Sequence, residues 1–102
     1  MAEFVKVVAA ADLQPGSCLQ AEVVGTAVAI FNVDGQFYAT TGTCPHQGGP
    51  LGEGSLDGCY VSCPWHDWTF DVVTGAHARN SEFCLGTYPV RVDDGQVLVK
   101  VE

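Results

Sequence analysis

Two short groups of cysteine and histidine lie in the segment 41–71, TGTCPHQGGPLGEGSLDGCYVSCPWHDWTFD. Cys44-Pro45-His46 forms a Cys-x-His pair, and Cys63-Pro64-Trp65-His66 forms a Cys-x-x-His pair, with sixteen residues between the two. A proline follows each cysteine, and because proline has a fixed φ it sets the direction of the chain behind the sulfur. Two thiols and two imidazoles on two loops make a set of four metal ligands.

Two kinds of metal centre fit this ligand set. A structural zinc ion takes Cys and His in a tetrahedral site, whereas a 2Fe–2S cluster of the Rieske type takes two Cys on one iron and two His on the other. Zinc fingers usually pair Cys with Cys and His with His. Because each pair here supplies one Cys and one His, each loop can reach both irons of a cluster. The pattern therefore favours the cluster over zinc.

The composition limits the possible partners. The 102 residues are 47% hydrophobic and 16% charged, which is typical of one folded domain. Four basic residues against twelve acidic ones give a formal net charge of −8, which argues against a nucleic-acid-binding surface. The longest apolar runs are too short to span a bilayer, and the N-terminal residues lack the positive charge of a signal peptide. We therefore expect a cytoplasmic protein with no nucleic-acid or membrane partner.

Outside the ligand pairs the pattern predicts an all-β fold, a small antiparallel sandwich or barrel. Asp34-Gly35 and Asp94-Gly95 predict tight hairpin turns. The strands expected from alternation and β-branched content are 4–8, 17–24, 26–33, 36–40, 88–92 and 96–101. A single helical turn is expected at 9–13, and the glycine-rich segment 41–58 is expected to be a loop. No linker divides the chain, so residues 1–102 are expected to form one domain with a cluster-binding subdomain at about 41–71.

The two ligand pairs and the residues around them resemble the Rieske iron–sulfur family. The resemblance covers about the whole chain and includes Cys44-Pro-His46-Gln-Gly-Gly-Pro-Leu, Cys63-Pro-Trp-His66-Asp-Trp-Thr-Phe-Asp, Thr74-Gly75, Tyr88-Pro89-Val90 and Asp93-Asp94-Gly95. It implies the Rieske fold, with a two-loop cluster-binding subdomain. It also implies one Rieske 2Fe–2S cluster per chain, bound by Cys44, His46, Cys63 and His66.

The same resemblance implies a low reduction potential. High-potential members of the family tie the two loops together with a disulfide, whose positions match Gly49 and Trp65 in this chain. Those members also place Ser and Tyr hydroxyls near the sulfur atoms, where this chain has Trp68 and Phe70. Fewer hydrogen-bond donors to sulfur leave the reduced cluster less stabilised, which lowers the potential.

The expected function is electron transfer rather than catalysis. A terminal oxygenase needs a second iron site of two His and a carboxylate, and His77 is the only further histidine. By resemblance, the chain is a soluble, monomeric Rieske ferredoxin that carries electrons from a flavoprotein NAD(P)H reductase to a terminal aromatic-ring-hydroxylating oxygenase. Its acidic charge suits docking on basic partner surfaces. The alternatives are the small subunit of an assimilatory nitrite reductase-like enzyme and a zinc-stapled interaction module.

The remaining cysteines and aromatic residues carry expectations of their own. Cys18, Cys59 and Cys84 lie outside the ligand pairs, and each is expected to be a small buried hydrophobe. Trp68 is expected to pack in the core, and Trp65 to shield the cluster from solvent. His77 is expected at the surface or in a turn.

Overall fold

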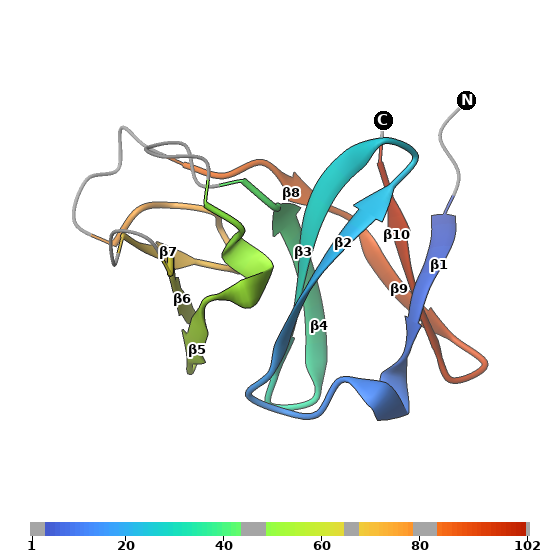
Figure 1. Cartoon of the computed structure of the whole chain (residues 1–102). Helices are drawn as coiled ribbons and strands as arrows, with labels where there is room; N and C mark the ends of the chain where they lie inside the picture. Colours follow the sequence, from blue (N-terminus) through green and yellow to red (C-terminus); the bar gives the residue numbers. More distant parts are fainter. Residues whose placement is uncertain (1–3, 44–48, 65–67, 79–83, 102) are drawn as a thin grey trace.

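The computed structural model of the chain describes residues 4–43, 49–64, 68–78 and 84–101, and within them the fold is built from antiparallel strands (Figure 1). The strands are β1 (Phe4–Ala9), β2 (Cys18–Val23), β3 (Thr26–Val33), β4 (Gln36–Thr41), β5 (Ser55–Asp57), β6 (Tyr60–Ser62), β7 (Thr69–Asp71), β8 (Thr87–Tyr88), β9 (Val90–Asp93) and β10 (Gln96–Lys100). Two 3₁₀ turns, η1 (Ala10–Asp12) and η2 (Leu51–Glu53), complete the described elements. The expected all-β class is confirmed.

The described strands form three sheets. Their strand orders are β1-β10-β9, β2-β3-β4-β8 and β5-β6-β7. In Figure 1 the small sheet β5-β6-β7 lies at the opposite end of the molecule from β1-β10-β9, with the sheet that contains β3 between them. Within the described ranges, no helix has the length and apolar character needed to cross a bilayer.

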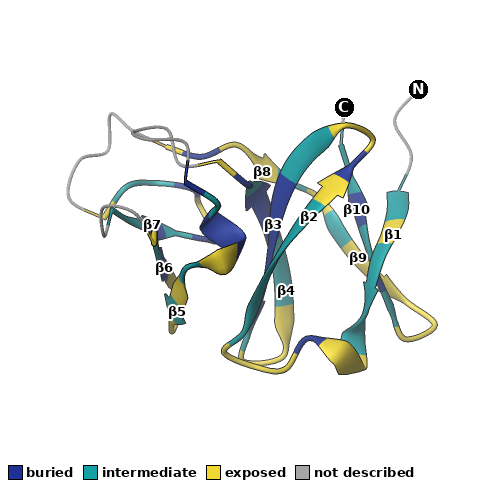
Figure 2. Ribbon diagram, in the orientation of Figure 1, coloured by how far each residue is buried: buried dark blue, intermediate teal, exposed yellow. Residues whose placement is uncertain are grey.

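Strand β3 is buried on both of its faces, and this explains its nearly continuous apolar sequence. Val28 and Ile30 belong to one hydrophobic cluster with Val97 and Val99 of β10. Ala29 and Phe31, which point the other way because side chains alternate along a strand, belong to a second cluster with Leu51, Val61, Cys63, Phe70, Val72 and Leu85. Figure 2 marks much of β3 as buried. The small sheet therefore packs against the face of β3 that carries Ala29 and Phe31, through this second cluster.

The hairpin turns follow their sequence signals. Asp34-Gly35 has φ values of 51° and 94°, and Asp94-Gly95 has 52° and 76°, as the predicted two-residue turns require. Val24-Gly25 has the same form, with φ values of 50° and 79°. The sequence marked Gly25 as a break between strands but gave no sign that Val24 also adopts a left-handed conformation.

Two expectations about strands were wrong. The strand expected at 88–92 is interrupted at Pro89, which has no N–H for a ladder, and the chain passes there from the sheet of β8 to the sheet of β9. The glycine-rich segment 41–58, expected as a loop, contains η2 and β5. A strand of three residues is too short to show alternation in the sequence.

Candidate metal centre

Of the four predicted ligands, the structure describes Cys63, whereas Cys44, His46 and His66 lie outside the described residues. Cys63 directly follows β6, and its side chain is completely buried in the cluster that contains Phe70. None of the described cysteines forms a disulfide. A buried thiol with no covalent partner is a suitable ligand for a soft metal centre.

The backbone around Cys63 closes the second ligand loop. Ser62 pairs with Thr69 at the end of the β6–β7 ladder. Beyond this pair, the N–H of Cys63 donates a hydrogen bond to the carbonyl oxygen of Trp68 at 2.8 Å. The chain segment that carries the predicted ligand His66 is thus anchored at both ends.

The first ligand loop is closed in a similar way. The N–H of Leu51 donates to the carbonyl oxygen of Gly42 at 2.9 Å, and Thr43 and Pro50 form an isolated antiparallel bridge. The N–H of Gly42 donates in turn to the carbonyl oxygen of Ala27 at 2.9 Å, which ties this closure to the start of β3. The segment that carries Cys44 and His46 therefore starts and ends at one point, where β4 ends and β3 begins.

The closed ends of the two loops lie next to one another. Ser55, the first residue of β5, pairs with Ser62, the last residue of β6. Gly54 lies so close to the carbonyl oxygen of Ser62 that a β-carbon at position 54 would collide with it. Leu51 and Cys63 share the same buried cluster. The short β5–β6 hairpin therefore connects the end of the first loop to the start of the second.

Three aromatic rings pack together on and beside β7, where the second ligand loop ends. The ring of His77 meets the ring of Trp68 edge-on, with centroids 4.8 Å apart, and that of Phe70 at 5.1 Å. The expectation for Trp68 is confirmed, since it packs against the cluster around Phe70. His77, expected at the surface or in a turn, is half-buried, and its bridge to Phe70 brings the imidazole against the two rings.

The remaining cysteines differ in exposure. Cys18 and Cys59 are half-buried and pack against the core, close to expectation, whereas Cys84 is exposed. Cys84 was mispredicted because its neighbour Leu85 takes the inward position, and successive side chains of an extended segment point to opposite sides. The Cys18 thiol donates to the carbonyl oxygen of Gly54 at 3.4 Å, and burial raises the pKa of this thiol.

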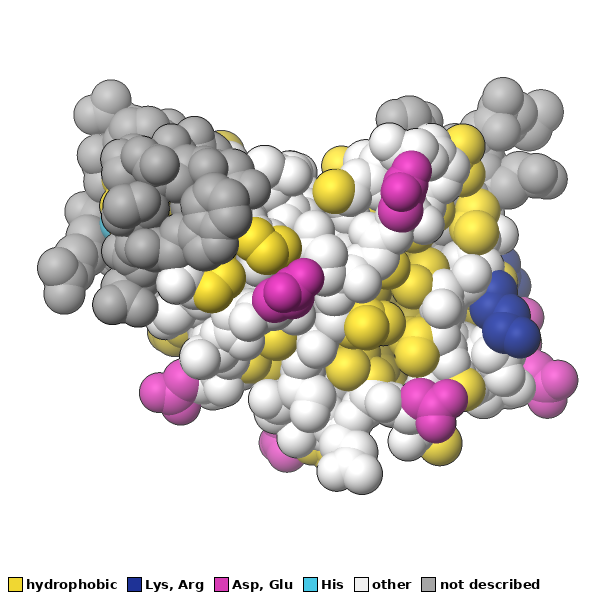
Figure 3. Space-filling view, in the orientation of Figure 1, with side chains coloured by type: hydrophobic (Ala, Val, Ile, Leu, Met, Phe, Trp, Pro, Cys, Tyr) yellow, Lys and Arg dark blue, Asp and Glu magenta, His cyan; other side chains and the backbone are white. Residues whose placement is uncertain are grey.

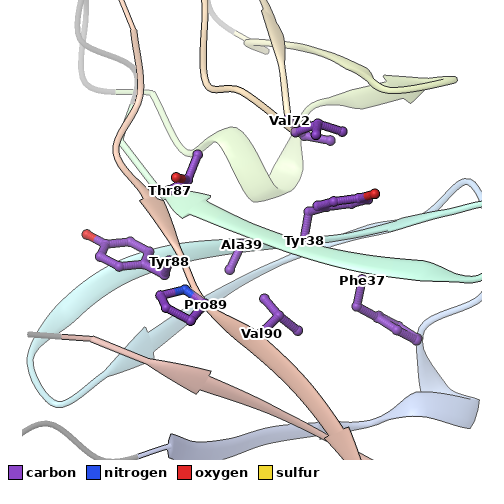
Figure 4. A pocket seen from close by; sticks show the side chains of 9 residues that line it. Phe37, Tyr38, Ala39, Val72, Thr87, Tyr88, Pro89 and Val90 are labelled. Atoms are coloured by element: carbon purple, nitrogen blue, oxygen red, sulfur yellow. The ribbon is translucent and has the colours of Figure 1, made fainter.

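A groove of about 450 Å³ lies between the larger sheet and the small one, lined by residues 37–39, 72–73 and 87–90 (Figure 4). In the described lining, the polar side-chain groups are the hydroxyls of Tyr38, Thr87 and Tyr88. Tyr38 and Tyr88 lie on either side of Ala39 in Figure 4. Among the described residues that line the groove there is no carboxylate and no imidazole.

The Rieske [2Fe-2S] domain model matches residues 3–89 of the chain. The chain belongs to the Rieske family. Ferredoxin CarAc of Metapseudomonas resinovorans is 44% identical over 97% of this chain and 94% of its own length. A ferredoxin solved in complex with the oxygenase of carbazole 1,9a-dioxygenase is 42% identical, with a TM-score of 0.87, and the match covers 94% of this chain and 91% of that one.

Membership of the Rieske family establishes the cofactor as a Rieske 2Fe–2S cluster rather than zinc. The described residues fit this cluster. The buried thiol of Cys63 lies where the second ligand loop is closed, and the closed ends of the first ligand loop lie beside it. Within the described ranges, no three Cys, His, Asp or Glu side chains are grouped so as to bind a metal ion. Cys63 is the one predicted ligand that those ranges contain.

The type of Rieske protein follows from the same comparisons. A solved structure described as a nitrite reductase small subunit is 27% identical, with a TM-score of 0.81 and coverage of 95% of this chain and 97% of that one. Identity to the two ferredoxins named above is higher, at 44% and 42%. The chain is therefore a ferredoxin-type electron carrier and not a catalytic subunit.

Proposed function

We propose that this chain is the ferredoxin component of an aromatic-ring-hydroxylating oxygenase system. It takes single electrons from a flavin-dependent NAD(P)H reductase and passes them to the terminal oxygenase. The observation that carries this proposal is the 44% identity to ferredoxin CarAc along nearly the whole of both chains. The related ferredoxin solved in complex with the oxygenase of carbazole 1,9a-dioxygenase is a precedent for the contact with a terminal oxygenase.

The ligands in this proposal are Cys44, His46, Cys63 and His66. The two cysteines bind one iron and the two histidines the other, as in Rieske centres generally. With two thiolates and two neutral imidazoles, the oxidised cluster is formally neutral and accepts one electron. The two closed loops support this assignment, because each holds one Cys and one His of the set between anchored ends.

A direct test of the ligands is a set of single substitutions. Cys63→Ser and His66→Ala are expected to abolish the visible absorption of the cluster and its bound iron, since each removes one of the four ligands. Cys84→Ser is the matched control, because Cys84 is exposed and lies outside the ligand pairs. A His66→Ala protein with an unchanged visible spectrum would refute the ligand assignment.

We also propose that the centre has a low potential. Phe70 is completely buried and has no hydroxyl to donate to sulfur. Trp68, half-buried, occupies the other position at which high-potential members carry a hydroxyl. Fewer donors to sulfur make the reduced state less stable.

Three further parts of the proposal concern the organisation, the oligomeric state and the location of the protein. Residues 1–102 form one domain, with a cluster-binding subdomain at about 41–71 that packs on β3 through Leu51, Val61 and Phe70. The protein acts as a monomer. It works in the cytoplasm, where a reduced nicotinamide cofactor is available to its reductase.

The distribution of charge supports docking on basic partner surfaces. The described basic residues Lys6, Arg91 and Lys100 all lie on β1, β9 and β10. Figure 3 shows acidic side chains spread over one face, with Lys and Arg atoms only at the edge near β1. Glu53 and Asp57 are exposed on and beside the small sheet. Such a surface suits partners with basic docking sites.

Electron transfer to a partner tests the proposal as a whole. The protein is reduced with dithionite under argon, freed of excess reductant and mixed with the oxidised terminal oxygenase of carbazole 1,9a-dioxygenase. The proposal predicts that the visible absorption of the ferredoxin returns as the oxygenase is reduced. A protein that stays reduced in the presence of this oxygenase and of other aromatic-ring oxygenases would contradict the assigned role.

A further inference from the structure

The side chain of Gln20 connects the two ends of the first ligand loop. Its Nε2 donates to the carbonyl oxygen of Gly42 at 3.0 Å, and its Oε1 accepts from the N–H of Gly52 at 2.8 Å. Gly42 precedes the segment that contains Cys44 and His46, and Gly52 follows it. One amide group therefore holds both ends of the loop.

The surrounding packing leaves little freedom for this contact. A β-carbon at Gly42 would press on the Gln20 amide nitrogen, and one at Gly52 would collide with the Gln20 backbone. Both loop ends thus approach Gln20 as closely as glycine permits. The half-buried amide uses both its donor and its acceptor in doing so.

The position of Gln20 in the sheet is unusual for a polar residue. Gln20 pairs with Ala29, and Cys18 on the same strand pairs with Phe31. Ala29 and Phe31 belong to the cluster that holds the small sheet, so Gln20 points from an apolar face toward the cluster-binding loops. A polar group on such a face is unfavourable unless it is hydrogen-bonded, and here the bonds come from the loop ends.

We propose that Gln20 is a positioning residue for the first ligand loop. Gln20 fixes the distance between Gly42 and Gly52 and so sets the geometry in which the loop holds its ligands. That geometry determines how fast the cluster is lost and which g-values the reduced cluster has. This inference rests on the proposed function, because it takes Cys44 and His46 as ligands.

Three variants separate this role from general support of the fold. Gln20→Met keeps the length of the side chain and removes both hydrogen bonds. Gln20→Glu keeps the acceptor for the Gly52 N–H and loses the donor to Gly42. Glu22→Met is the matched control, since Glu22 is exposed on the same strand and points to the same side.

The holoproteins are compared for the rate at which visible absorption is lost to an iron chelator, and for the g-values of the dithionite-reduced cluster. Gln20→Met is expected to lose its cluster about tenfold faster than the wild type, the factor that one to two net hydrogen bonds represent. Its g-values are expected to shift, which loss of fold stability alone does not cause. Gln20→Glu is expected to be intermediate in rate, and Glu22→Met to behave as the wild type.

The possible results distinguish the two proposals. A wild type that binds no iron–sulfur cluster would overturn the proposed function and this inference with it. A wild type with a Rieske cluster and a Gln20→Met variant with the same rate and g-values would overturn this inference alone. If Gln20→Met gives no folded holoprotein, Gln20→Glu decides: wild-type rate and g-values in that variant reject the role of the Gln20–Gly42 bond.

Discussion

Val24 adopts a backbone conformation that its β-branched side chain disfavours. Its φ of 50° lies in the left-handed region, and its side chain is 79% exposed, so no packing offsets the strain. For residues other than Gly, Asn and Asp this conformation costs about 1–2 kcal/mol. Asp34 and Asp94 occupy the same position in the other two-residue turns, and aspartate tolerates it better.

We therefore expect Val24→Asn to stabilise the protein by about 1 kcal/mol, measured by chemical denaturation of the holoprotein. Val92→Asn is the control, because Val92 is also exposed but lies within β9. This second change is expected to bring no gain, since asparagine is a poorer strand residue than valine. Equal stabilisation by both changes would show that surface hydrophobicity, and not the turn, is responsible.

The thiol of Cys18 gives a prediction about pH. Burial raises its pKa, so the folded state holds this proton to a higher pH than the unfolded chain does. Above the ordinary thiol pKa, Cys18 ionises in the unfolded chain but stays protonated in the folded one. The free energy of unfolding is therefore expected to fall as pH rises through this range.

Alkylation of the native protein, mapped by mass spectrometry, is expected to modify the exposed Cys84 before Cys18 at every pH. Faster modification of Cys18 would contradict its placement.

At the scale of elements, the small sheet β5-β6-β7 determines where Cys63 lies. Phe70 on β7 is completely buried in the same cluster as Cys63 and also contacts the ring of His77. Phe70→Ala is expected to cost roughly 3–5 kcal/mol and to lower the temperature at which visible absorption is lost. Tyr60→Ala, at an aromatic residue 43% exposed on the adjacent β6, is expected to change that temperature little. Similar losses in both variants would mean that the buried contact of Phe70 is not what supports the loop.

The sequence predicted the longer strands, such as β3, better than the three-residue strands of the small sheet. Strand β3 has eight residues between two turns, and the dipeptides Asp34-Gly35 and Asp94-Gly95 determine their turn type by themselves. Strands β5, β6 and β7 have three residues each and are fixed by tertiary contacts that no local pattern encodes. The partners of Gln20 lie 22 and 32 residues away in the sequence, which is why Gln20 was not singled out for its actual contacts.

Residue type and spacing predicted the four candidate ligands, and the resemblance to the Rieske family implied the kind of cluster that they bind. The Cys and His pairs indicated four ligands without any knowledge of the fold, and the structure adds the closure of both loops and the burial of Cys63. Local spacing could not show that β5 and β6 connect the two loops, because Ser55 and Ser62 become neighbours only through the hairpin.

At the scale of the whole molecule, charge is expected to control encounters with partners. The chain has a formal net charge of −8, and the described basic residues lie on the sheet farthest from the small one. The rate of electron transfer to the oxygenase at low protein concentration is expected to fall as sodium chloride is raised from about 0.01 to 0.15 M, over which the screening length shrinks from about 30 to 8 Å. A rate independent of salt would argue against docking through acidic side chains.

The central claim, that this chain carries a Rieske cluster and transfers single electrons, is tested most directly by one spectroscopic measurement. Optical and low-temperature EPR spectra of the purified protein are recorded before and after addition of dithionite. The account predicts a red-brown protein that bleaches on reduction and gives a spin-half EPR signal with a low average g-value. A colourless, EPR-silent protein with one zinc ion per chain would contradict it.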